Sequence, residues 1–156
     1  MSLSAGQAAP DFTLFDTQKQ TLTLSELKGR NVVILFFPLA FTSVCTKELC
    51  DMRDSISWYN NVNASVLGIS VDSLFSLGKF REEQQLNFPL LSDFNKEVST
   101  AYGSLYETFG FGMKGVSKRS AFVIDKEGII RYAEVLENAG EVPDFGAIRS
   151  VLEGLA

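Results

Sequence analysis

The segment from Asn31 to Phe37 constrains the fold more than any other part of this chain of 156 residues. It reads NVVILFF, a continuous apolar run rich in β-branched residues, which is the pattern of a strand covered on both faces. Pro38 ends the run, because proline has no backbone N–H to donate to a neighbouring strand. We therefore expect a central strand of a sheet that is buried on both sides.

A second apolar run, at 65–71, predicts the next strand. Between the two runs, Thr42 or Ser43 offers an N-cap to a helix that reaches about Asn60. Another helical stretch, at 73–86, follows the second strand. The order strand, helix, strand forms a βαβ unit, whose two strands we expect to be parallel.

The remaining segments alternate between short strands and helices. We expect a hairpin at 11–24, a strand at 88–91, a helix at 95–102, an aromatic loop at 103–118, hairpin strands at 121–125 and 129–133, and a terminal helix at 144–155. No repeat, linker or low-complexity segment interrupts this series. The pattern therefore predicts one domain over residues 1–156, an α/β fold of the thioredoxin-like kind, with a mixed central sheet flanked by helices and an extra N-terminal hairpin.

Composition excludes several classes of function. The formal charge is −5, and no basic cluster is longer than Lys118-Arg119, which argues against a nucleic-acid partner. No apolar segment is long enough to span a membrane, and the N-terminus lacks a signal-peptide pattern, so we expect a cytoplasmic protein. The absence of histidine excludes Ser-His-Asp hydrolysis, Cys-His chemistry and every metal site that requires imidazole.

Cys45 and Cys50 are the only cysteines, too few for a zinc site of four thiolates or a secreted disulfide framework. Helical periodicity places the two on different stripes of the predicted helix. Cys45 shares its stripe with Leu49, Met52, Ile56 and Tyr59. Cys50 shares the other with Lys47, Asp54 and Ser57. The two thiols therefore face different surroundings.

The position of Cys45 in the first turn of this helix favours its thiolate, the reactive form, because unpaired N–H groups and the helix dipole stabilise an anion by about 0.3–1 kcal/mol. Five residues of helix separate Cα atoms by roughly 8–9 Å, whereas a disulfide tolerates about 7 Å at most. A bond between Cys45 and Cys50 therefore requires local unwinding. The plain alternative is that Cys45 is a small core residue and Cys50 an incidental surface thiol.

The string PLAFTSVC, from Pro38 to Cys45, resembles the PxxxTxxC active-site motif of peroxiredoxins, and its place between a buried strand and a helix start is also that of the family. Segments 88–93, 101–103 and 119–131 resemble further blocks of the same family. The wording FFPLAFTSVCTKEL is most similar to the AhpE-like group of bacterial peroxiredoxins. Cys50, five residues after Cys45, resembles the resolving position of the PrxQ or bacterioferritin-comigratory type.

The resemblance implies a thiol-dependent peroxidase that reduces hydrogen peroxide or organic hydroperoxides without a cofactor or metal. The Cys45 thiolate would attack the peroxide and become a sulfenic acid, which Cys50 or an external thiol would then resolve. The implied reductant is thioredoxin, a glutaredoxin-like protein or a low-molecular-weight thiol. The implied assembly is a homodimer.

Four further residues have roles implied by the same resemblance. Charge develops on the departing oxygen, and the Thr42 hydroxyl, the Cys45 backbone N–H and the Arg119 guanidinium are the candidate donors to it. Pro38 would shield the sulfur from water, and Glu48 would hold the arginine in place. Each also has a structural alternative, since a proline can simply end a strand, a threonine cap a helix, and a charged side chain lie in solvent.

Two rival functions are weighed against the peroxidase. A thiol-disulfide oxidoreductase would need a CxxC at the helix start and a cis-proline before the strand that follows 116–119, and the sequence has neither. A redox sensor or holdase partner stays open, because sensing and catalysis share the oxidation of Cys45. Three aromatic residues, Tyr106, Phe109 and Phe111, either line a substrate entrance or subunit contact, or pack in the core.

Overall fold

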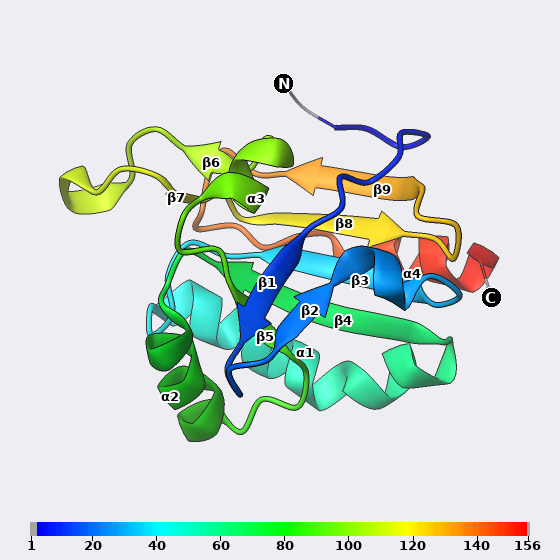
Figure 1. Ribbon diagram of the computed structural model, residues 1–156, viewed down its shortest axis with the longest axis horizontal. Helices are drawn as coiled ribbons and strands as arrows, with labels where there is room; N and C mark the ends of the chain where they lie inside the picture. Colours follow the sequence, from blue (N-terminus) through cyan, green and yellow to red (C-terminus); the bar gives the residue numbers. More distant parts are fainter. Residues whose placement is uncertain (1–2, 156) are drawn as a thin grey trace.

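The computed structural model describes residues 3–155, which form a seven-stranded sheet of order β2-β1-β5-β4-β3-β8-β9 with helices packed against it (Figure 1). The strands of this sheet are β1 (Thr13–Asp16), β2 (Thr21–Thr23), β3 (Asn31–Phe36), β4 (Ala64–Ser70), β5 (Leu90–Ser92), β8 (Ser120–Ile124) and β9 (Ile130–Val135). The α-helices are α1 (Ser43–Asn61), α2 (Leu74–Gln84), α3 (Glu97–Ala101) and α4 (Phe145–Leu155), and a 3-10 turn, η1 (Leu24–Leu27), follows β2. The mixed sheet flanked by helices and the extra N-terminal hairpin agree with the fold predicted from the sequence.

Strand β3 is an interior strand next to β4, the middle strand of the sheet, and every one of its residues is buried, as its apolar run predicts. It pairs in parallel with β4 and antiparallel with β8. Its side chains alternate between two cores: Val33 and Leu35 pack with residues of α1, α2 and α4, whereas Ile34 and Phe36 pack with residues of α3, η1 and the N-terminal segment. The parallel βαβ unit predicted from the sequence is therefore confirmed.

The parallel arrangement of β3 and β4 sends their carboxyl ends to the same side of the molecule, the left of Figure 1, where α1 and α2 begin. Loops at the carboxyl ends of parallel strands are the usual place for a functional site in open α/β sheets. The two cysteines of α1 are therefore presented at this edge of the sheet.

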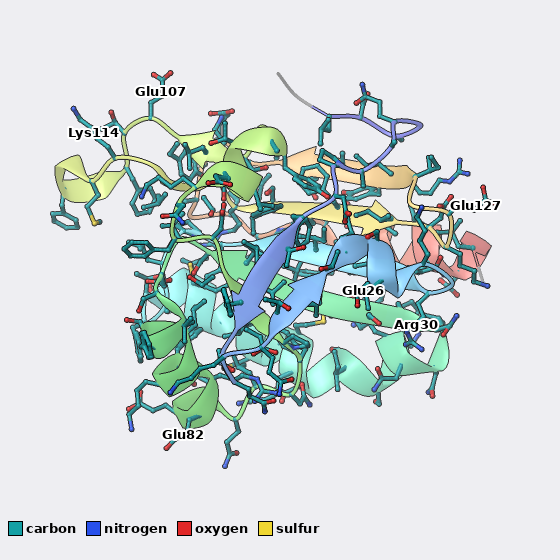
Figure 2. The ribbon with its side chains drawn as sticks, viewed as in Figure 1. Glu26, Arg30, Glu82, Glu107, Lys114 and Glu127 are labelled. Atoms are coloured by element: carbon teal, nitrogen blue, oxygen red, sulfur yellow. The ribbon has the colours of Figure 1, made fainter. Side chains whose placement is uncertain are left out.

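Both predicted hairpins are present, with β1 paired antiparallel to β2 and β8 antiparallel to β9. The predicted loop at 103–118 contains more order than its glycines suggest, because β6 (Leu105–Tyr106) and β7 (Val116–Ser117) pair across it around a short turn, η2 (Gly110–Gly112). Glu107 and Lys114 project outward from this excursion (Figure 2).

The three aromatic residues of this excursion have different fates. Tyr106 is buried, stacks on Phe109 at 5.5 Å between ring centroids, and donates its hydroxyl to the Leu136 carbonyl at 2.9 Å. Phe111 is fully exposed, at 104% of its reference area. Core packing thus accounts for Tyr106, and Phe111 is left on the surface.

Among the helices described here, none has the length and hydropathy needed to cross a bilayer.

Candidate active site

Strand pairing brings Arg119 to the end of β3, although it is 74 residues away from Cys45 along the chain. Phe36, the last residue of β3, lies opposite Ser120, the first residue of β8. Arg119 therefore stands just beyond the sheet, beside the loop that connects β3 to α1. Pro38 is buried in this loop.

Cys45 lies in the first turn of α1, and only 1% of its surface is exposed. Thr46 is the first residue whose N–H bonds back along the helix, to the Thr42 carbonyl at 2.9 Å, so the N–H of Cys45 has no partner within the helix. No acidic side chain lies in this turn. The first turn therefore favours negative charge on the sulfur.

Arg119 is buried and connects Cys45 to Glu48. One guanidinium nitrogen, Nη2, lies 3.1 Å from Cys45 Sγ, while Nη1 lies 2.6 Å from Glu48 Oε1. The remaining nitrogen, Nε, donates to the Ala139 carbonyl at 2.9 Å. A planar guanidinium that is engaged on all three nitrogens cannot rotate without breaking at least one of these contacts.

Arg119 and Glu48 form a buried ion pair, with 2% of the arginine side chain and 0% of the glutamate side chain exposed. The alternative of a solvated surface charge is therefore wrong for both residues. Burial raises the pKa of Glu48 to about 7, even though Arg119 acts in the opposite direction. Burial alone disfavours the charged arginine, but Glu48 and Cys45 together raise the pKa of Arg119 above its usual value. The guanidinium therefore stays protonated beside the sulfur.

Thr42 occupies the N-cap position of α1, but its side chain does not cap the helix. Its Oγ1 donates instead to the Leu39 carbonyl at 2.8 Å. The predicted donation from the Thr42 hydroxyl toward a substrate stays a prediction, and in this structure the hydroxyl donates within the loop. Because its proton is already engaged within the loop, the oxygen presents lone pairs and can accept a hydrogen bond.

Asp72 fixes the loop that holds Thr42, and sequence reasoning missed it. Its Oδ2 accepts from the Ala40 N–H at 2.8 Å and from the Ser70 hydroxyl at 2.6 Å. The sequence could have indicated this contact, because Asp72 follows β4, and the carboxyl ends of the parallel strands β3 and β4 lie at the same edge of the sheet. Phe41, next in the loop, has a φ of 69°, a left-handed conformation that costs a non-glycine residue on the order of 1 kcal/mol or more.

Cys50 is half-buried and lies away from the guanidinium. Its Sγ donates to Gln84 Oε1, at the end of α2, at 3.4 Å. Arg53, one turn further along α1, donates to the Gln84 carbonyl at 2.5 Å. Both cysteines are free thiols in this structure, and α1 is continuous between them. The predicted difference between their surroundings is confirmed.

Comparison with known proteins identifies the chain. Residues 5–133 match the AhpC/TSA family. The chain is a peroxiredoxin of this family. Alkyl hydroperoxide reductase E of Mycobacterium tuberculosis is 41% identical to it over 145 residues, which cover 91% of each chain. The resemblance to the AhpE-like group is therefore confirmed, and the peroxiredoxin is a thiol-dependent peroxidase.

Solved structures support the same assignment. Peroxidoxin BcpB from Mycobacterium tuberculosis superimposes with a TM-score of 0.85 at 31% identity, covering 99% of both chains. A peroxiredoxin-like protein from Aquifex aeolicus gives a TM-score of 0.90 over 100% of this chain and 90% of its own, and at 24% identity it bears on the fold alone. Within residues 3–155, no three His, Cys, Asp or Glu side chains gather as a metal site.

We predict that Glu48→Gln removes a pH-dependent contribution to the free energy of unfolding of this peroxiredoxin. The pKa of Glu48 rises from 4.5 to about 7 on burial, so the folded chain holds a proton that the unfolded chain releases in this range. The unfolding free energy of the wild type, relative to Glu48→Gln, should therefore fall by a few kcal/mol, on the order of 3, as the pH rises through this window.

Urea unfolding at a series of pH values measures this difference. Glu83→Gln, which changes an exposed glutamate of α2, is the matched control and should keep the wild-type pH dependence. A Glu48→Gln variant whose stability follows the wild type in parallel across the window would contradict the assignment of a buried, proton-binding carboxyl.

Proposed function

We propose that Cys45 is the peroxidatic residue and that Arg119 is the principal electrostatic group of the reaction. The observation that carries this proposal is the buried guanidinium that lies 3.1 Å from Cys45 Sγ and 2.6 Å from Glu48 Oε1. A fixed, desolvated cation beside a thiol stabilises the thiolate and any negative charge that forms next to it.

In the proposed reaction, the Cys45 thiolate attacks the terminal oxygen of a hydroperoxide. An S–O bond forms, the O–O bond breaks, and the leaving hydroxide or alkoxide takes a proton, which leaves Cys45 as a sulfenic acid. Charge moves from the sulfur to the leaving oxygen, so a donor that reaches both positions favours the transition state over the reactants. Arg119 is held beside the sulfur by its contacts with Glu48 and the Ala139 carbonyl, so the guanidinium does not need to reorient during the reaction.

The other loop residues have supporting roles in this proposal. The Thr42 oxygen would accept the peroxide O–H, because its own proton is engaged by Leu39. The unpartnered N–H of Cys45 would donate to the peroxide oxygens. Pro38, which is buried and has no N–H, would exclude water from the sulfur. Glu48 would act as a positioning residue through Arg119.

Cys50 is the proposed resolving thiol. Its attack on the Cys45 sulfenic acid would form a disulfide and release water. The two residues lie in one continuous helix, whose geometry separates them by more than a disulfide allows, so the first turns of α1 must unwind and the contact between Cys50 and Gln84 must break. Reduction by an external thiol without Cys50 is the alternative, and Cys45 acting as a redox sensor is a second one.

The substrate is a hydroperoxide and the reductant a thiol. One relative is named alkyl hydroperoxide reductase E, and this name supports organic hydroperoxides, besides hydrogen peroxide, as proposed substrates of this chain. Thioredoxin, a glutaredoxin-like protein and a small thiol are the proposed reductants. The cytoplasmic location stays a prediction.

Stopped-flow tryptophan fluorescence tests the two cysteine roles, because Trp58 lies on the same helix. Reduced wild type mixed with hydrogen peroxide should show a fast phase and a slower one. Cys45→Ser should abolish both phases, since no sulfenic acid forms. Cys50→Ser should keep the fast phase and lose the slow phase, since no disulfide follows.

Mass spectrometry after one equivalent of peroxide provides the independent check. The wild type should lose two hydrogens as the disulfide forms, and Cys50→Ser should gain one oxygen at Cys45. A wild type that keeps a stable sulfenic acid would overturn the resolving role of Cys50, whereas a wild type that reacts no faster than a free thiol would overturn the role of Cys45.

A homodimer is the proposed assembly, and exposed phenylalanines support it. Phe41, Phe75, Phe94 and Phe111 are all exposed, on loops or first turns that follow β3, β4, β5 and β6. Figure 1 places these segments along the left edge of the molecule. Several large apolar side chains on one edge are typical of a surface that a partner covers.

Sedimentation velocity tests this surface. The wild type should sediment with twice the mass of the 17.2 kDa chain, and Phe75→Glu should shift it toward the monomer, because a charge replaces a ring in the contact. Ser76→Glu adds the same charge at the next position of α2 without removing a ring, and it should remain dimeric. A wild type that sediments as a monomer at all concentrations would contradict the proposal.

A further inference from the structure

A small cavity lies between α1 and α4, away from the residues that surround Cys45. Its volume is about 110 Å³, and its walls are Asp51, Met52, Ser55, Tyr59, Phe145 and Arg149. A cavity of this size holds more than one water molecule, or one ligand of a few non-hydrogen atoms. Neither the fold nor the peroxidase reaction accounts for the polar groups in its walls.

Two of these polar groups are buried without a partner. Tyr59 is 0% exposed, and its hydroxyl makes no hydrogen bond among residues 3–155. Arg149 is half-buried, but its Nε is buried and also makes no hydrogen bond among these residues. None of the ion pairs found among residues 3–155 includes Arg149. Buried polar groups in folded proteins are nearly always satisfied, and Arg149 lies close enough to the Tyr59 hydroxyl to lower its pKa against the effect of burial, so the two groups form one cluster of donors in the wall of this cavity.

Arg149 is held in place by aromatic rings rather than by an acid. Its guanidinium carbon lies 5.4 Å from the ring centroid of Trp58 and 5.9 Å from that of Tyr59. These contacts orient the cation over the two rings, and its Nε is without a hydrogen-bond partner among the described residues. Burial raises the pKa of Tyr59, with Arg149 acting in the opposite direction, so the phenol keeps its proton and can donate it.

The donor set selects an anion. Arg149, Tyr59 and Ser55 offer N–H and O–H groups, whereas Met52 and Phe145 offer apolar surface. The one acid in the wall, Asp51, is paired with Lys47 at 3.0 Å and is 63% exposed, so its charge faces solvent. A guanidinium fork matches a carboxylate or another planar oxyanion, and the apolar wall suits a short hydrocarbon tail.

We propose that this cavity binds a short-chain carboxylate, of the size of acetate, through Arg149, Tyr59 and Ser55, with its methyl group against Met52 and Phe145. The site is distinct from the peroxide site and does not depend on the roles proposed for the cysteines. Both helices that form it are anchored to the same core, so the ligand would bridge α1 and α4.

Titration of Trp58 fluorescence with sodium acetate, at constant ionic strength, tests the proposal directly, because Arg149 lies on the Trp58 ring. A ligand of so few atoms binds no tighter than tens of micromolar, so the titration runs from about 10 µM to about 50 mM. The wild type should give a saturable change. Acetamide, the neutral isostere, should give none.

Matched arginine variants locate the response. Arg149→Gln should weaken acetate binding by about tenfold or more, because the charged half of the contact is lost. Arg131→Gln removes an arginine of β9, which pairs with Asp125, and this variant should bind acetate as the wild type does. Equal responses in wild type and Arg149→Gln, an equal response to acetamide, or no saturable response would overturn the site.

Tyr59→Phe keeps the ring but lacks the hydroxyl, so it tests whether the hydroxyl binds acetate. The readout is the gain in thermal stability on adding acetate, which a purely structural role of the hydroxyl would leave unchanged. Without acetate, this variant should unfold at the same temperature as the wild type or higher, because it lacks an unsatisfied buried hydroxyl. With acetate, the wild type should gain more thermal stability than Tyr59→Phe. The same acetate-dependent shift in both proteins would show that the hydroxyl does not bind the anion.

Discussion

The buried guanidinium of Arg119 is the interaction on which the site depends. A cation removed from water is stable only when it is paired and hydrogen-bonded, and here Glu48, the Ala139 carbonyl and the Cys45 sulfur occupy its nitrogens. The arrangement is possible because β8 pairs antiparallel with β3, so that the residue before β8 reaches the loop after β3. The pairing of β3 with β8 thus places the guanidinium beside Cys45 Sγ.

The two thiols of one helix differ because their surroundings differ. Cys45 lies under the loop, in contact with a cation and with the open end of the helix, which favours the thiolate. Cys50 faces α2 and donates its hydrogen to Gln84 Oε1 at 3.4 Å. The two thiols therefore lie in different surroundings within one helix, with Cys45 beside the buried Arg119 and Cys50 against the end of α2.

Much of this could be predicted from the sequence. The apolar run ending at Pro38, the helix that follows, and the motif through Cys45 are local signals, and the structure bears out the strand and the helix. The burial of Glu48 was not decided, because a glutamate on a helix reads the same whether it faces water or an arginine from a distant strand. The hydrogen bond from Thr42 to Leu39 and the anchoring of the loop by Asp72 were missed for the same reason: each depends on how the loop closes.

The most direct test of the account compares two reactions of Cys45 in the wild type and in Arg119→Lys. Lysine keeps a charge but cannot hold the sulfur and Glu48 at once. Oxidation by hydrogen peroxide, which develops charge on a leaving oxygen, should slow by about 10²–10³-fold, whereas alkylation by iodoacetamide should change by only about tenfold or less. If both reactions slow equally, Arg119 stabilises only the thiolate, and the claim that it acts on the transition state of peroxide cleavage is contradicted.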